Sequence, residues 1–245
     1  MLKIIQITDC HLLQDQDALL QGCNTDKSFA HILNKAVACR PDYLILTGDL
    51  SEDGSLSSYQ RMHAALLATG LKFFVLPGNH DHIEHIQKIF QDRLMLDCSV
   101  LIEGWRLIFL NSVLPGMHYG FLADASLQFL RSELTQSDTR PTAIFVHHHP
   151  VDTGNAFINR YNIHNAAAFL EILSCSLHLK FVAFGHIHHA LSVMMAGVSF
   201  FGAPSSCFQF RGDIDGVVID PAVGSGYRIF ELADDGGFNT WVEGV

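Results

Sequence analysis

The chain has 245 residues, of which 49% are hydrophobic and only 16% are charged. This length fits one large domain, and the composition suits a compact α/β core with little disordered tail. The formal net charge of −10 argues against a polyanionic partner such as DNA, because binding of DNA rests largely on Lys and Arg contacts to phosphates. We therefore expect a single domain over residues 1–245 and no nucleic acid among its partners.

The sequence also argues against secretion and membrane insertion. Its first residues run directly into a strand-like segment, without a long apolar region or a cleavage site. It contains no run of 18 apolar residues, the approximate minimum for a membrane-spanning helix. The six cysteines are widely spaced and form no Cys-x-x-Cys pair. We therefore expect a reduced, cytoplasmic location and no membrane partner.

Apolar runs rich in β-branched and aromatic residues predict central strands. In chain order these runs cover residues 4–7, 43–46, 73–76, 143–146 and 181–184. Apolar stripes with helical spacing predict helices over residues 29–37 and 127–134. Further strands are expected at residues 106–111, 197–202, 227–232 and 240–243. Because strands dominate the later segments, a mixed sheet or two stacked sheets flanked by helices fits better than a purely parallel sheet.

A short polar cluster follows each of the five predicted central strands. The clusters are Asp9-Cys10-His11, Gly48-Asp49, Gly78-Asn79-His80-Asp81, His147-His148-His149 and Gly185-His186-Ile187-His188. In open α/β sheets ligands bind beyond the carboxyl ends of the strands, so these clusters can converge on one crevice. In an extended backbone the side chains of residues i and i+2 point to the same side. We therefore expect Asp9 and His11 to face one common centre, and His186 and His188 likewise to face one common centre.

The side chains of these clusters predict a metal site. The candidate ligands are Asp9, His11, Asp49, Asn79, His147, His186 and His188. Imidazoles, carboxylates and an amide without a thiolate suit hard-to-borderline ions such as manganese, iron or zinc. This set exceeds the needs of one tetrahedral ion but suits two ions that share Asp49. We expect two divalent or trivalent transition-metal ions, iron and manganese before zinc.

Taken together and in this order, the motifs resemble those of the calcineurin-like metallophosphoesterases. The pattern of that family is Asp-x-His, Gly-Asp, Gly-Asn-His-Asp/Glu, His and Gly-His-x-His, and the resemblance spans positions 9–188. It implies an α/β fold, a four-layer αββα sandwich of two mixed β-sheets flanked by helices, with a dinuclear metal site at the strand carboxyl ends. It also implies that one ion is held by Asp9, His11, Asp49 and His188, and the other by Asp49, Asn79, His147 and His186.

Within that superfamily the chain is most similar to the bacterial class III cyclic-nucleotide phosphodiesterases, the 3′,5′-cyclic AMP phosphodiesterase type. The similar segments are His147-His148-His149-Pro150, Gly185-His186-Ile187-His188 and residues 204–210. The chain departs from that group at residues 151–153, where the group has Pro-rich sequence, and at His164, where it often has Arg before Asn165. These departures fall where the nucleoside is expected, so the base preference stays open.

The resemblance implies hydrolysis of 3′,5′-cyclic AMP to the 5′-monophosphate by in-line attack of a hydroxide that bridges the ions. Two cations lower the pKa of a shared water from about 15.7 toward about 7. His80 is the expected general acid, because it follows the ligand Asn79 but lies on the opposite side of the chain. Asp81, Glu52 or Asp53 could orient it. Expected substrate contacts come from His11, Asp49, Asn79, His80, His147, His188 and Asn165.

Other residues of the clusters and several isolated histidines are expected to play structural parts. Cys10 is expected to pack away from Asp9 and His11. His148 and His149 are expected behind the ligands or at the rim of the site. Phe208 and Phe210 are expected in the core more than in a base-stacking platform. Histidines without motif support are expected on the surface or in the ordinary core: His31, His63, His82, His85, His118 and His178.

Several other functions remain as alternatives. The first is a broad-specificity phosphodiesterase acting on glycerophosphodiesters or 2′,3′-cyclic nucleotides. A phosphoprotein phosphatase is disfavoured because residues 48–54 lack the Arg of that family's motif, and a nuclease because no basic groove or added domain is visible. A metal-free scaffold protein of the same fold is disfavoured because all seven candidate ligands are retained. The sequence leaves the oligomeric state open.

Overall fold

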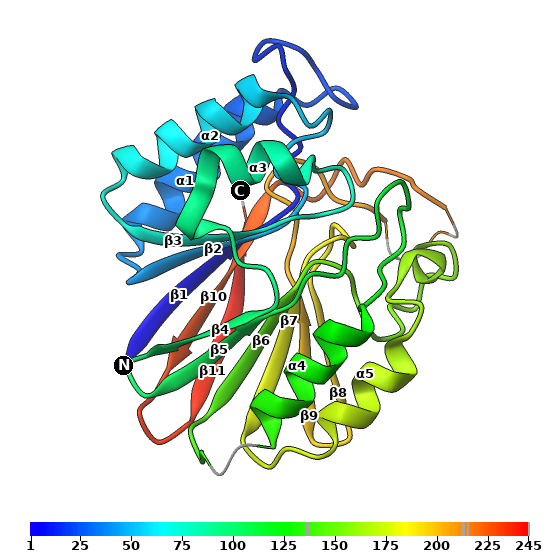
Figure 1. The fold of residues 1–245 in the computed structure, drawn as a ribbon. Helices are drawn as coiled ribbons and strands as arrows, with labels where there is room; N and C mark the ends of the chain where they lie inside the picture. Colours follow the sequence, from blue (N-terminus) through cyan, green and yellow to red (C-terminus); the bar gives the residue numbers. More distant parts are fainter. Residues whose placement is uncertain (136–137, 212–213, 215, 245) are drawn as a thin grey trace.

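The computed structural model describes residues 1–135, 138–211, 214 and 216–244, and it contains two packed β-sheets (Figure 1). The first sheet consists, in spatial order, of β11 (Phe238–Gly244), β10 (Gly226–Leu232), β1 (Leu2–Ile7), β2 (Tyr43–Thr47) and β3 (Lys72–Leu76). The second consists of β4 (Cys98–Ile102), β5 (Trp105–Phe109), β6 (Thr142–Val146), β7 (Leu179–Phe184), β9 (Val198–Gly202) and β8 (Leu191–Met195).

Helices cover the outer faces of both sheets (Figure 1). The first sheet is covered by α1 (Thr25–Ala38), α2 (Leu56–Ala68) and α3 (Ile83–Phe90), and the second by α4 (Asp124–Leu134) and α5 (Ala166–Leu173). Two short 3₁₀ turns, η1 (Gln91–Arg93) and η2 (Ile158–Tyr161), follow α3 and precede α5. Parallel and antiparallel pairs occur in each sheet. The predicted four-layer αββα sandwich of two mixed sheets is therefore confirmed.

Three apolar cores separate the four layers and explain the sequence of the central strands. Successive side chains of a strand point to opposite faces. In β1, Ile4 packs between the two sheets with Phe145 and Phe230, whereas Ile5 and Ile7 pack under the helices of the first sheet. A strand buried on both faces needs apolar residues throughout, which is why these strands read as continuous apolar runs.

The strands and helices predicted from the sequence are all present, with ends that differ by a few residues. Five elements were not predicted from the sequence: the strands β4 and β8 and the helices α2, α3 and α5. β4 and β8 form the two edges of the second sheet and are half-exposed along much of their length, so they lack the apolar run of a central strand. Among the described residues, no helix combines the length and the apolar character that a membrane crossing requires.

Candidate metal centre and active site

The five polar clusters meet at one edge of the two sheets, beyond the carboxyl ends of β1, β2, β3, β6 and β7. Within the first sheet β1, β2 and β3 run parallel to one another, and within the second sheet β6 runs parallel to β7. The carboxyl ends of the strands in each sheet therefore lie at the same edge. The first sheet supplies Asp9, Asp49 and Asn79, and the second supplies His147 and His186. Side chains up to 177 positions apart in the sequence are thereby brought into contact.

One compact group of donor atoms consists of Asp9, His11 and His188, whose ligand atoms all lie within 4.8 Å of one another. The two Nε2 atoms of His11 and His188 are 3.0 Å apart. His188 Nε2 is 3.5 Å from Asp9 Oδ1, and His11 Nε2 is 3.7 Å from Asp49 Oδ2. This group lies where the family resemblance implies the first ion.

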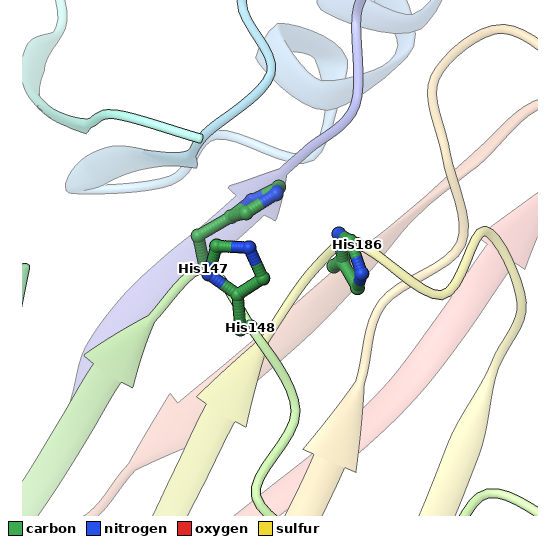
Figure 2. Close-up of side chains that lie close together, drawn as sticks. All are labelled: His147, His148 and His186. Atoms are coloured by element: carbon green, nitrogen blue, oxygen red, sulfur yellow. The ribbon is translucent and has the colours of Figure 1, made fainter. Parts of the chain in front are cut away.

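A second group surrounds His147 and His186, whose rings lie together with that of His148 beyond the strand ends (Figure 2). His147 Nε2 is 3.5 Å from Asp49 Oδ2 and 3.2 Å from Asn79 Oδ1. Asp49 also forms a group with Asp9 and His147, so its carboxylate lies between the two sets of donors. His148 was not predicted to be a ligand, although it belongs to this group of imidazoles.

The hydrogen bonds of the imidazoles show that the donor set fits metal ions. Three rings turn Nδ1 to an oxygen outside the centre: His11 to Glu52 Oε2 at 2.7 Å, His147 to the Thr47 carbonyl at 2.7 Å, and His188 to the Phe208 carbonyl at 2.9 Å. Carbonyls and carboxylates only accept, so each ring donates from Nδ1, and in its neutral form it presents a lone pair at Nε2. Lone pairs that face one another and nearby carboxylates repel, and a cation between them relieves that repulsion.

Burial and charge set the protonation of these groups. Burial raises the pKa of Asp9 to about 6. Burial would also raise the pKa of Asp49, but the nearby imidazole of His147 holds it well below its ordinary value. Burial lowers the pKa of His186 and of His188 well below its ordinary value. Neutral imidazoles and an ionised carboxylate are the forms that bind metal ions.

Most of the candidate ligands have a left-handed backbone. The φ angles are 52° at Asp9, 48° at His11, 48° at Asp49, 69° at His186 and 48° at His188. Residues other than glycine rarely adopt this conformation, and such strained residues cluster at functional sites. The prediction that ligands two residues apart align along an extended strand is therefore wrong. Asp9 and His11 do share a group, but His186 and His188 enter different groups.

Two glycines let the backbone approach the carboxylates of the centre. A Cβ atom on Gly78 would collide with the carboxylate and backbone nitrogen of Asp49. A Cβ atom on Gly185 would collide with Thr8 and would lie 2.8 Å from Asp9 Oδ2. Glycine is needed at both positions because no side chain fits between these strand ends.

Glu52 is the carboxylate that orients His80, a choice that the sequence left open. Its Oε2 lies 3.2 Å from His80 Nδ1. Asp81 instead accepts hydrogen bonds from backbone N–H groups, including that of Gly78 at 2.8 Å. Burial opposes protonation of His80, but the hydrogen bond to Glu52 and the charge of Asp49 raise its pKa to about 9. Burial would raise the pKa of Glu52, yet its hydrogen bonds with the two imidazoles lower it to about 2.

A cavity of about 620 Å³ opens above the candidate metal centre. Its floor is formed by five of the candidate ligands: His11, Asp49, Asn79, His186 and His188. Its wall is largely apolar, with aromatic side chains that include Phe157, Tyr161, Phe208 and Phe210. Phe208 and Phe210 were expected in the core more than in a base-stacking platform, whereas both line this cavity. Phe210 stacks on the ring of His188 with centroids 4.3 Å apart, and it also packs partly against the core beneath α4 and α5.

Two further residues bear on the expected site. His118, which was expected on the surface or in the ordinary core, is exposed, and it also lines the cavity. Asn165, expected to contact the substrate, is not among the described residues that line it. Its side-chain amide instead exchanges two hydrogen bonds with the backbone of Leu122, at 3.0 and 2.7 Å. Asn165 therefore ties the start of α5 to a neighbouring loop. Cys10 packs in the core beneath α1, α2 and α3, away from the donor groups.

Comparison with known proteins agrees with this geometry. The sequence model of the family described as calcineurin-like phosphoesterase matches residues 2–190. The chain is 34% identical over 247 residues to a 3′,5′-cyclic-nucleotide phosphodiesterase of Nostoc sp., covering 100% of this chain and 92% of the relative. It is 30% identical over 247 residues to the 3′,5′-cyclic adenosine monophosphate phosphodiesterase CpdA of Escherichia coli K12, covering 98% and 88%. A solved dimetal phosphatase from Danio rerio has the same fold, with a TM-score of 0.72, 14% identity, and 94% and 92% of the two chains covered.

Proposed function

Because the chain belongs to the calcineurin-like phosphoesterase family, we propose that it is a two-metal phosphodiesterase that hydrolyses 3′,5′-cyclic AMP and related cyclic nucleotides to the 5′-monophosphate. The observation that carries this proposal is the pair of buried donor groups joined by Asp49 at the floor of a cavity with aromatic walls. The floor suits a phosphodiester, and the wall suits a planar base.

In this proposal one ion is held by Asp9, His11, Asp49 and His188, and the other by Asp49, Asn79, His147 and His186. The absence of a thiolate from this set favours iron or manganese, with zinc as the alternative. When bound, such ions lower the pKa of a coordinated water and neutralise charge on phosphoryl oxygens. The chain itself fixes three of the donors in place through the hydrogen bonds at the far side of the His11, His147 and His188 rings.

His80 is the proposed general acid for the 3′ oxygen that leaves the phosphorus. The ring lines the cavity, and Glu52 holds its Nδ1 side, so the opposite edge of the ring is available to the substrate. An alkoxide is a poor leaving group and needs a proton as the bond breaks. The other proposed substrate contacts come from His11, Asp49, Asn79 and His188 on the floor of the cavity, and from His147, which is fully buried beside Asp49 and does not itself line the cavity.

A broader specificity is the second candidate, because the wall is mostly apolar and offers few groups that read the edge of a base. The test is kcat/KM of the metal-reconstituted protein for cyclic AMP, cyclic GMP, 2′,3′-cyclic AMP, a glycerophosphodiester and an aryl phosphodiester. The proposal predicts that a 3′,5′-cyclic nucleotide is the best natural ester. A preference for a non-nucleotide ester would support the broader enzyme, and a metal-loaded protein that hydrolyses none of them would refute both.

A further inference from the structure

The loop between β5 and α4 brings His118 into the cavity, beside the candidate catalytic residue His80 and the candidate ligand Asn79. His118 Nδ1 lies 3.4 Å from Asn79 Nδ2. Its ring centroid is 5.7 Å from that of His80, and it meets the ring of Tyr161 edge to face at 6.4 Å. The side chain is otherwise exposed. An imidazole therefore lies at the polar end of the cleft without belonging to either donor group.

The neighbouring amide fixes which nitrogen of His118 carries the proton. Asn79 Oδ1 is the proposed metal donor of this amide and lies 3.2 Å from His147 Nε2, so Nδ2 faces His118. An amide N–H only donates, so His118 Nδ1 is the acceptor of this contact and Nε2 is the nitrogen that carries an N–H. His118 thereby offers the cleft a single N–H donor.

The loop that carries His118 is attached to His148 at both ends. His148 is fully buried, and its Nδ1 lies 2.8 Å from Ser112 Oγ. The same hydroxyl oxygen accepts a hydrogen bond from the backbone N–H of His148 at 3.3 Å. At the other end of the loop, Gly120 packs so closely that a Cβ atom there would lie 2.7 Å from His148 Cβ. Since His148 follows His147, the loop is positioned relative to the candidate metal centre.

We propose that His118 is a substrate-contacting residue that donates a hydrogen bond from Nε2 to a phosphoryl oxygen of the bound ester, and that His148 is a positioning residue that holds the loop through Ser112 and Gly120. A phosphoryl oxygen is the proposed acceptor because His118 lies beside Asn79 and His80, at the polar end of the cleft. The identity of the ester rests on the proposed function.

The contact is tested by comparing the metal-loaded parent with the His118→Ala variant. We expect the variant to bind inorganic phosphate, measured by calorimetry, roughly 10- to 100-fold more weakly, as for loss of a hydrogen bond to a charged group. Its kcat/KM for both cyclic AMP and bis(p-nitrophenyl) phosphate should fall, while its metal content stays unchanged. Met117→Ala is the matched control, because Met117 lies on the same loop, is 44% exposed and does not line the cavity.

Parental phosphate affinity in the His118→Ala variant would overturn the contact. This readout needs no turnover, so it separates the inference from the proposed function, which would fail if the parent hydrolysed no diester. The role of His148 is tested with Ser112→Ala, alone and combined with His118→Ala. Non-additive losses are expected, with the double variant no weaker in phosphate binding than His118→Ala alone, because the anchor acts through His118. Additive losses at an unchanged melting temperature would overturn the positioning role.

Discussion

The floor and the wall of the cavity differ in how deeply their side chains are buried and in where those residues lie in the fold. Beneath the floor, the candidate ligands Asp9 and His147 have no exposed surface, and each is hydrogen-bonded to the backbone of another segment. On the wall, Phe157 and Phe208 are half-exposed and lie on connections between regular elements. The candidate metal ligands stand at strand ends, whereas the residues proposed to select a substrate stand on loops. We therefore expect metal binding and substrate preference to be separable by mutation.

The sheets beneath the floor supply its rigidity. Gln6 of β1 donates hydrogen bonds from Nε2 to Thr47 Oγ1 in the same sheet, at 2.8 Å, and to the Phe184 carbonyl in the second sheet, at 3.0 Å. The two sheets are therefore linked directly below the candidate ligands. A left-handed backbone costs about 1–3 kcal/mol per residue, and it persists only where the surrounding structure holds it in place. On the wall, Gln21 also has a left-handed backbone, at φ 52°, but the aromatic residues Phe157, Tyr161, Phe208 and Phe210 do not.

The largest expected effect comes from Asp49, the floor residue between the two donor groups. Asp49→Asn removes the charge that both ions are proposed to share, so we expect loss of bound metal and a fall in kcat of more than about 10³-fold. Elemental analysis and turnover of cyclic AMP measure the two effects. Asp92→Asn, which alters an exposed carboxylate on η1, should match the parent. An Asp49→Asn protein that keeps two ions per chain would contradict the shared position.

His80→Ala should separate catalysis from metal binding on the same floor. We expect kcat for cyclic AMP to fall by roughly 10²–10⁴-fold with full metal occupancy, because the leaving alkoxide loses its proton donor. The loss should be much smaller for an aryl phosphodiester, whose phenoxide leaves without a proton. Unchanged turnover of cyclic AMP at full metal occupancy would remove His80 from the mechanism.

Glu52→Gln should give an intermediate effect, because Glu52 contacts both a candidate ligand and the candidate acid. Its Oε2 lies 2.7 Å from His11 Nδ1 and 3.2 Å from His80 Nδ1. Residues that orient metal ligands typically contribute roughly 10- to 100-fold to affinity or activity, and we expect a loss of that size. Metal titration and kcat measure it. Glu84→Gln, an exposed carboxylate on α3, is the control, and parental values for Glu52→Gln would show that neither contact matters.

The sequence predicted the floor far better than the wall, for a physical reason. Asp49 and His147 directly follow strands that must be apolar on both faces, so the transition from apolar run to polar cluster marks the site. The left-handed turns at Asp9 and His11 leave no such pattern, and the direction of these side chains was predicted from the wrong backbone. The place of His118 depends on a loop whose course follows from contacts with His148, and no local periodicity encodes such a contact.

The smallest expected effect comes from the wall. Phe157→Ala removes an aromatic face that lines the cavity, so KM for cyclic AMP should rise roughly 2- to 10-fold while kcat stays at the parental value. Phe121→Ala, which removes a 40% exposed ring that does not line the cavity, should change neither constant. Affinity for inorganic phosphate, which has no base, should be the same in all three proteins. If Phe157→Ala lowered kcat or phosphate affinity instead, the wall would take part in the chemistry, and the separation between the two regions would not hold.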